Sequence, residues 1–313
     1  TYKSRAIDAR SASMQEQETV HMSVLDEISS VITATADRVG PSVVAVNRLG
    51  TGFVIDEGSV VTNAHNLRDA ETRVTFADGR VETATAVGVD VDGDLAVVSV
   101  NTGQAPAIEW SEETPTLGTF VVALSNARGR GLRATSGTVS SVDRSFRGPR
   151  GRRISGSLEH TAPLARGSSG GPVLDRDGRV VGINTHRLQE GFYLALAIGD
   201  DLRQRIAALS EGKVPSRRRL GVAIIPPQAA RHLREAAGLA HVEGLLVRGV
   251  EEAGPGARAG LRRGDVITAI GGRETKSIDD LHAALDTDAD ELVVNLVRAT
   301  EEQSATVRFD DPA

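Results

Sequence analysis

The chain of 313 residues contains no cysteine, which excludes disulfides and thiolate metal sites and leaves the redox compartment undetermined. Aromatic residues make up only 3% of it, against 40% hydrophobic residues, which predicts cores built from Val, Leu, Ile and Ala. No apolar run approaches the ~20 residues that a membrane helix needs. The formal net charge of −6 argues against a general nucleic-acid-binding protein, because such proteins are usually basic.

The first 21 residues are polar and lack the apolar core of a signal peptide. The segment 22–27 (Met-Ser-Val-Leu-Asp-Glu) resembles a natural start, so residues 1–21 are expected to be a polar extension that is disordered or non-native. With no export signal and no membrane span, the sequence as it stands predicts a cytoplasmic protein.

The length predicts two or more domains, since single hydrophobic cores stop growing near ~250–300 residues. Residues 22–40 place apolar side chains at helical spacing and end in Gly-Pro, which predicts an N-terminal helix. Residues 41–211 break into two groups of about six short β-rich runs each, followed by a closing helix over 200–209. Two such groups fit two antiparallel β-barrels packed against each other. A linker over 212–219 then leads to a second domain over 220–309.

Three motifs in the region 41–211 carry the chemistry. His65 ends the run Val-Thr-Asn-Ala-His, Asp94 begins Asp-Leu-Ala-Val-Val, and Ser169 lies within Gly-Ser-Ser-Gly-Gly-Pro. Glycines on both sides of a hydroxyl let the backbone approach a reacting carbonyl and direct N–H groups at it. A serine hydroxyl needs an adjacent base, and histidine can accept its proton and return it to a leaving amine. The chain order His, Asp, Ser is that of chymotrypsin-like enzymes.

These motifs resemble those of the bacterial HtrA/Deg family of serine proteases, which read Thr-Asn-x-His, Asp-(Leu/Ile)-Ala and Gly-Asn-Ser-Gly-Gly-Pro. Ser168 stands where the family usually has Asn, and the change is expected to be tolerated because that position contributes mainly a backbone amide. The segment 178–185 (Gly-Arg-Val-Val-Gly-Ile-Asn-Thr) resembles the family as well, and the likeness runs from about Val31 to Phe309. The resemblance implies a mainly β fold: a two-barrel, chymotrypsin-like serine protease domain followed by one α+β PDZ domain.

By this resemblance Ser169 would be the nucleophile, His65 the general base and Asp94 the group that holds the imidazole tautomer. The backbone amides of Gly167, Ser168 and Ser169 are the expected oxyanion hole. The resemblance implies no cofactor and no metal.

The specificity pocket is expected to be aliphatic. In trypsin an Asp six residues before the nucleophile binds basic side chains, and Pro163 stands at that position here. The pocket-lining stretches of the family align with Leu164, Leu194, Ala195 and Leu196. Such a pocket favours small or medium aliphatic residues at the cut site and has no carboxylate to pair with Lys or Arg. Arg166 lies just before the oxyanion turn. Its role stays open: it is either a residue of a regulatory loop or a solvated charge.

The second domain resembles PDZ domains through the segment 253–267, which is similar to Ser-Pro-Ala-x-x-Ala-Gly-Leu-x-x-Gly-Asp-x-Ile. Ala253 replaces the Ser of that signature, and one residue is inserted. A helix is expected over 277–285. The resemblance implies capture of peptide C-termini by strand addition. The residues expected to bind the peptide are Leu220, Gly221, Val222, Ile224, Leu281 and Leu285. Core packing accounts for the two leucines of the helix equally well.

Other patterns carry less information. The run 90–94 (Asp-Val-Asp-Gly-Asp) resembles the start of a calcium loop, but Leu95 and Asn101 stand where that loop needs Gly and Glu. Arginine-rich segments at 147–153 and 217–219 lack interleaved aromatic residues, which argues against nucleic acid or an anionic membrane as partner. The histidines outside the motif are interpreted as surface or packed residues: His21, His160, His186, His232, His241 and His282.

The sequence therefore predicts an HtrA-type serine endopeptidase that acts on unfolded or misfolded proteins. The alternative is a non-proteolytic peptide-binding chaperone or sensor with a latent protease domain. The family resemblance implies the alternative to a cytoplasmic location, which is a periplasmic or extracytoplasmic one, and both stay open. Family trimers use aromatic contacts near the start of the protease domain, where this chain has few, so a homotrimer stays open.

Overall fold

The computed structural model describes residues 23–68, 71–149, 151–188, 191–214, 218–225, 227–287 and 289–309. The expected polar extension 1–21 lies outside the described residues, as do residues 215–217 of the expected linker.

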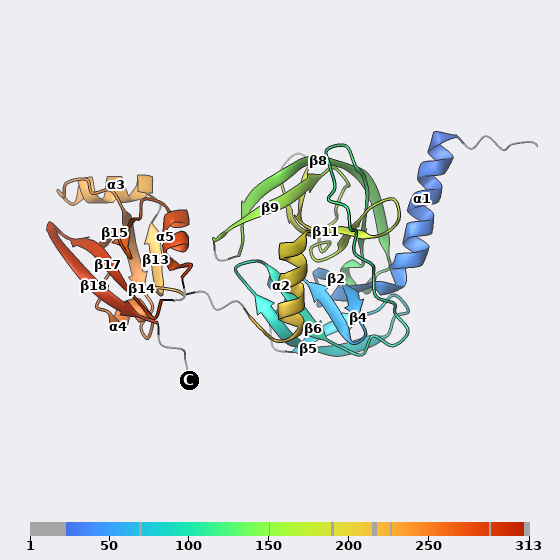
Figure 1. Cartoon of the computed structure of the whole chain (residues 1–313), viewed down its shortest axis with the longest axis horizontal. Helices are drawn as coiled ribbons and strands as arrows, with labels where there is room; N and C mark the ends of the chain where they lie inside the picture. The colour runs from blue at the N-terminus through green and yellow to red at the C-terminus, as the bar shows by residue number, and fades with distance from the viewer. Residues whose placement is uncertain are drawn as a thin grey trace, which may run out of the picture.

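Helix α1 (Val24–Val39) begins at a capping box, in which Ser23 Oγ accepts from the Asp26 N–H and the Asp26 carboxylate accepts from the Ser23 N–H. A short 3₁₀ turn, η1 (Gly40–Ser42), follows it. The C-terminal half of α1 packs on the barrels, while its first turn extends away from them (Figure 1).

Two closed six-stranded barrels form among the described residues, as the sequence predicts. The first has the order β1-β2-β3-β6-β5-β4 and the second β10-β11-β12-β9-β8-β7. The strands of the first barrel are β1 (Val43–Val46), β2 (Gly50–Asp56), β3 (Ser59–Thr62), β4 (Glu71–Thr75), β5 (Val81–Asp90) and β6 (Leu95–Ser99). Those of the second are β7 (Phe120–Ser125), β8 (Arg133–Arg147), β9 (Arg153–His160), β10 (Pro172–Leu174), β11 (Val180–Arg187) and β12 (Tyr193–Ala197).

One aliphatic core joins the two barrels. Phe53 and Leu95 of the first barrel and Leu124 and Ile183 of the second have no exposed surface and belong to the same cluster. Helix α2 (Asp200–Ser210) closes the domain by burying Leu202, Ile206 and Leu209 in this cluster. Because the barrels share a core, loops at their junction are held in fixed relative positions.

The C-terminal domain is a separate α+β unit with its own core. Its sheet has the order β13-β14-β15-β17-β18, with β16 paired to β15. Its elements are β13 (Val222–Ile225), α3 (Pro227–Ala236), β14 (Leu245–Val250), α4 (Pro255–Arg258), β15 (Val266–Ile270), β16 (Arg273–Glu274), α5 (Ile278–Leu285), β17 (Glu291–Arg298) and β18 (Glu301–Arg308).

Two arginine–aspartate pairs connect the domains. Arg147, at the end of β8, donates to both carboxylate oxygens of Asp279 at 2.9 and 3.1 Å. Arg152, just before β9, donates likewise to Asp286 at 3.0 and 3.3 Å. Figure 1 accordingly shows α5 on the side of the C-terminal domain that faces the barrels. Such exposed pairs contribute little stability, so they orient the domains rather than lock them.

Candidate active site

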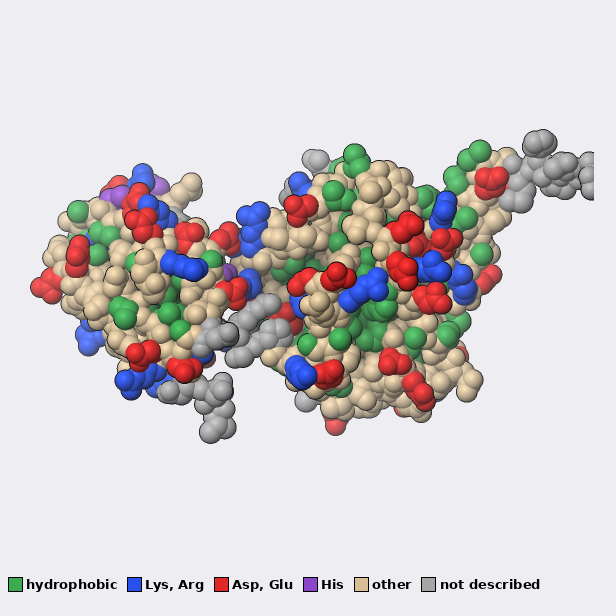
Figure 2. Space-filling view, viewed as in Figure 1, with side chains coloured by type: hydrophobic (Ala, Val, Ile, Leu, Met, Phe, Trp, Pro, Cys, Tyr) green, Lys and Arg blue, Asp and Glu red, His purple; other side chains and the backbone are tan. Residues whose placement is uncertain are grey.

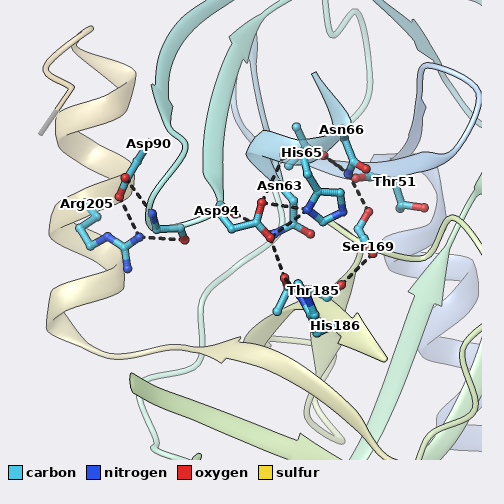
Figure 3. Close-up of polar contacts among 12 residues, drawn as sticks. Thr51, Asn63, His65, Asn66, Asp90, Asp94, Ser169, Thr185, His186 and Arg205 are labelled. Carbon is cyan, nitrogen blue, oxygen red and sulfur yellow. Dashed lines mark hydrogen bonds and ion pairs between the residues drawn. The ribbon is translucent and has the colours of Figure 1, made fainter. Parts of the chain in front are cut away.

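The fold brings His65, Asp94 and Ser169 together between the barrels (Figure 3). His65 lies in the 3₁₀ turn η2 (Ala64–Asn66) after β3, and Asp94 lies in the turn between β5 and β6. Ser169 comes from the loop before β10, in the second barrel. Figure 3 shows the His65 ring between the other two side chains.

The Asp94 carboxylate is fully buried and accepts three kinds of hydrogen bond. His65 donates its Nδ1–H to both carboxylate oxygens at 2.8 and 2.9 Å and its backbone N–H to Oδ1 at 3.2 Å. Thr185 Oγ1 donates to Oδ2 at 2.7 Å. This arrangement selects the Nδ1–H tautomer of neutral His65 and leaves Nε2 free to accept a proton.

The backbone at Asp94 has a positive φ of 52°, a conformation that aspartate tolerates better than most residues. Asn63 holds it there, because its side-chain amide donates to the Asp94 carbonyl at 2.8 Å. The Asn of the Thr-Asn-Ala-His motif therefore fixes the carboxylate that orients the histidine two residues further along the chain.

The turn that carries Ser169 depends on glycine. Gly167 and Gly170 have φ values of 93° and 87°, which disfavour any residue with a Cβ. A Cβ on Gly170 would also lie 2.0 Å from the carbonyl oxygen of Thr51 in the first barrel. The two barrels thus approach each other through bare backbone at this residue.

Side chains and backbone of the first barrel clamp the carbonyls of this turn. The Thr51 N–H and the Asn66 side-chain amide each donate to the Ser169 carbonyl at 2.9 Å. Thr51 Oγ1 donates to the Gly167 carbonyl at 2.7 Å. Amides of Gly167 and Ser169 make no hydrogen bond within the described part of the chain, whereas the Ser168 N–H donates to the Ala165 carbonyl at 3.3 Å. Two of the three expected oxyanion donors are therefore free and the third is engaged.

The Ser169 hydroxyl does not point at His65. It donates to the Thr185 carbonyl at 2.8 Å, and no hydrogen bond joins it to His65 among the residues described.

Known proteins resemble this chain in both of its domains. Residues 50–183 match the trypsin-like peptidase domain, and residues 246–298 match the PDZ domain. The chain is 32% identical over 273 residues to a probable periplasmic serine endoprotease DegP-like of Halomonas elongata, covering 84% of this chain and 56% of that one. It is 30% identical over 274 residues to the putative serine protease HhoB of Synechocystis sp., covering 83% and 65%. The chain belongs to the HtrA/DegP-like family.

Solved structures of the family superpose on nearly the whole chain. The serine endoprotease from Yersinia pestis, 25% identical, has a TM-score of 0.61 and covers 89% of this chain and 98% of that one. The HtrA-type protease AlgW with a tripeptide, also 25% identical, has a TM-score of 0.57. The chain spans about half the length of most of the curated relatives it matches.

Two residues of this HtrA-type site were not expected from sequence. Thr185 contacts both Asp94, through its hydroxyl, and Ser169, through its carbonyl. Thr185 is the last residue of the segment 178–185 that resembles the family, so the sequence contained a pattern that could have indicated it. His186 follows it, with its ring centre 6.5 Å from that of His65, and no motif indicated this histidine.

His186 packs on the ring of Phe146, with ring centres 4.9 Å apart. Partial burial in this contact lowers the pKa of His186 below its ordinary value, with a raising contribution from the Asp94 charge and a further lowering one from His65. The ring is therefore neutral near pH 7 and gains a charge, beside the site, as the pH falls.

A cavity of about 150 Å³ opens beside Ser169. Leu164 lines it as expected, but Leu194, Ala195 and Leu196 do not. Tyr193 lines it instead. Alternate residues of a strand face opposite sides, so Leu194 and Leu196 of β12 face away from Tyr193, while Ala195 shares the face of Tyr193 but is buried further along the strand. Leu194 and Ala195 are buried in the barrel, and Leu196 lines a separate cavity near the start of α2.

The residues expected to bind peptide in the PDZ domain are divided between core and surface. Leu220, Leu281 and Leu285 are buried in the domain core, so core packing accounts for them. Val222 and Ile224 of β13 are half-buried and pack against the same core. Gly221 has a positive φ of 67°, and a Cβ there would contact the side chain of Glu251.

Neither a metal site nor a membrane-spanning helix is found in the described ranges. No three or more His, Asp and Glu side chains gather there in a way that could hold an ion. No helix in them is long and apolar enough to cross a bilayer.

Proposed function

We propose that the chain is a serine endopeptidase in which Ser169 is the nucleophile, His65 the general base and Asp94 the residue that holds the His65 tautomer. The observation that carries this proposal is the buried Asp94 carboxylate bonded to His65 Nδ1–H, opposite a serine turn with two free amides. A histidine fixed in this way presents Nε2 to a hydroxyl that needs a base.

The reaction begins when the Ser169 hydroxyl turns from the Thr185 carbonyl to His65. Its oxygen attacks the substrate carbonyl while His65 Nε2 takes the proton, and the buried Asp94 stabilises the resulting imidazolium. The amides of Gly167 and Ser169 donate to the oxyanion. His65 then protonates the leaving amine, and a water molecule hydrolyses the acyl-enzyme by the same steps in reverse order.

The proposed substrates are unfolded or misfolded proteins cut after small or medium aliphatic residues. Leu164 and Ala165 give the cavity beside Ser169 an apolar wall, and no acidic residue lines it to attract Lys or Arg at the cut site. Several relatives are named as periplasmic endoproteases, which supports a periplasmic location for this chain as well.

The test is digestion of unfolded casein by the unchanged protein and by two serine variants. Ser169→Ala should abolish cleavage, whereas Ser168→Ala, its neighbour in the same turn, should keep it, because only the amide of residue 168 belongs to the turn. Mass-spectrometric mapping should place Val, Ala, Leu or Ile before the cuts. Equal activity of the unchanged protein and Ser169→Ala would reject the enzyme proposal, and a majority of cuts after Lys or Arg would reject the aliphatic preference.

One observation favours a second candidate, a peptide-binding chaperone or sensor with a latent protease domain. The Ser169 hydroxyl donates to the Thr185 carbonyl and not to His65, as a resting enzyme would have it. A latent protein would leave casein intact yet suppress the aggregation of a heat-denatured protein, which light scattering measures, and Ser169→Ala would change neither result.

We further propose that the PDZ domain binds peptide C-termini through β13 and the backbone around Gly221. The Gly221 carbonyl accepts from the Glu251 N–H at 2.8 Å, which orders the loop before β13. The Glu251 side chain beside Gly221 opposes a bound anion, so a comparison of free-acid and amidated peptides is informative. Calorimetric titration should show binding of apolar free-acid peptides that amidation and Gly221→Trp both weaken. Equal binding of free-acid and amidated peptides would reject carboxylate capture.

A further inference from the structure

The cavity beside Ser169 is positively charged around an apolar floor. Arg166 and Arg187 supply the charge, and they line the cavity together with Leu164, His186 and Tyr193. No Asp or Glu among the described residues lines it. The protein as a whole carries a formal net charge of −6, and acidic and basic side chains are interspersed on the face shown in Figure 2. The positive charge is therefore a local property of the cavity, and the surface in general does not share it.

Neither arginine of the cavity has an acidic partner within the part of the chain that the structure describes. Among the described residues Arg166 and Arg187 form no ion pair, although many other arginines do, including Arg147, Arg152 and Arg298. The Arg187 guanidinium lies over the Tyr193 ring, 5.9 Å from its centre, so its charge is held above the floor of the cavity. An unpaired guanidinium held at a site is available to a carboxylate from outside the chain.

Both arginines belong to segments that adjoin Ser169. Arg166 directly precedes Gly167, whose amide is free to bind the oxyanion. Arg187 ends β11, two residues after Thr185, which contacts Asp94 and Ser169. An extended peptide advances ~3.3 Å per residue, so residues next to the cut bond pass within reach of these side chains.

We propose that this cavity selects protein substrates that carry a Glu or Asp side chain close to the scissile bond, and that Arg166 and Arg187 bind this carboxylate. The inference rests on the proposed endopeptidase function and names its substrate class. The apolar floor takes the aliphatic residue before the cut, and the arginines bind an acidic neighbour. Guanidinium–carboxylate pairs are charge-assisted and can be bidentate, and complementary charge also speeds encounter.

The experiment uses matched peptides built on a casein sequence that the enzyme cuts. Each peptide places Glu, Gln or Lys at one of the three positions before the cut residue or the two positions after the cut. We expect kcat/KM for Glu to exceed that for Gln by roughly tenfold at one or more positions, and the ratio to fall in high salt. Lys should be the poorest residue at the same positions.

Arginine variants assign the effect to the cavity. Arg166→Gln and Arg187→Gln should each reduce the Glu-to-Gln ratio, and Arg166→Glu or Arg187→Glu should reverse it in favour of Lys. Arg176→Gln, an exposed arginine in the turn between β10 and β11, should leave the ratio unchanged. An unchanged protein that does not distinguish Glu from Gln, or a preference that survives both arginine changes, would overturn the proposal.

Binding separates this inference from the endopeptidase function. Fluorescence anisotropy of the same labelled peptides with the Ser169→Ala variant needs no catalysis. A Glu preference in binding that both arginine changes abolish supports the cavity assignment even where casein is not cleaved. Equal binding of Glu and Gln peptides rejects the assignment even where casein is cleaved.

Discussion

The two barrels contribute unequal halves of the candidate active site. In the first barrel, Asp94 is fully buried, its carboxylate is bonded to His65 and Thr185, and its backbone is held by Asn63. In the second barrel, the turn that carries Ser169 is clamped, yet the hydroxyl itself donates to a backbone carbonyl away from His65. The fold thus fixes the orientation of His65 through several contacts, whereas the Ser169 side chain is held away from His65 by a single hydrogen bond to the Thr185 carbonyl.

The largest expected effect comes from breaking the preorganised half. Asp94→Asn keeps the shape of the side chain but favours the wrong His65 tautomer, and in comparable triads this costs ~10⁴ in turnover. Peptide cleavage kinetics near neutral pH measure it. Asp92→Asn, in the same turn, should remain within a few-fold of the unchanged protein. Activity of Asp94→Asn within about tenfold would show that the base is oriented by other contacts.

The next effect tests the turn on the other side. Gly170→Ala combines a positive φ with a Cβ 2.0 Å from the Thr51 carbonyl oxygen, so the barrels must separate at the site. We expect a loss of more than ~2 kcal/mol in the free energy of unfolding and loss of cleavage.

Gly191→Ala provides the matched control for that change. Its φ of 86° is nearly the same, but nothing lies within 4 Å of the added Cβ. Backbone strain alone, ~1–2 kcal/mol, is then expected in urea unfolding. Equal losses for the two variants would mean that the contact with Thr51 contributes nothing.

A smaller effect concerns His186, which comes from the second barrel and lies beside His65. Partial burial lowers the pKa of His186, Asp94 opposes this shift and His65 adds to it. His186 therefore becomes charged only at a pH below the ordinary pKa of histidine. A charged His186 disfavours the His65 imidazolium that the reaction forms, by an amount on the order of tenfold in rate. The acid limb of kcat should therefore be steeper than a single protonation allows, and His186→Phe should make it shallower. Identical limbs in the two proteins would remove His186 from the site chemistry.

The smallest expected effect is on stability. His160 in β9 is fully buried, and burial lowers its pKa despite the hydrogen bond of 2.9 Å to Asn184. A histidine whose folded pKa is lowered binds its proton more readily in the unfolded chain. Its contribution is therefore present above the unfolded pKa of ~6.5 and is lost as the pH falls below it.

Urea unfolding at several pH values checks the sign of that effect. His160→Gln should reduce the fall in unfolding free energy between about pH 6.5 and 5, because it removes one group that protonates on unfolding. His232→Gln, in the exposed part of α3, should leave the slope unchanged. An equal slope in all three proteins would mean that acid destabilises the barrels through other groups.

Sequence alone determined the strand-rich architecture and the three motifs, because both depend on local chemistry. Short valine-rich runs separated by glycine predict the two barrels that form here. Bare backbone at Gly167 and Gly170 is needed by the turn itself. Such requirements leave a readable pattern of residue types. The contact of Asn63 with Asp94, 31 residues apart in the chain, depends instead on the fold.

Only the tertiary structure decided which side chains surround Ser169. Strand register presents Tyr193 and not Leu194 to the cavity, and a difference of one residue reverses the face of a strand. His186 and the two arginines reach the site because β11 and the loop before Ser169 end there, and no local pattern marks their types. The hydrogen bond from the Ser169 hydroxyl to the Thr185 carbonyl also depends on the fold. The rotamer of a side chain is decided by its spatial neighbours, and these come from distant parts of the sequence.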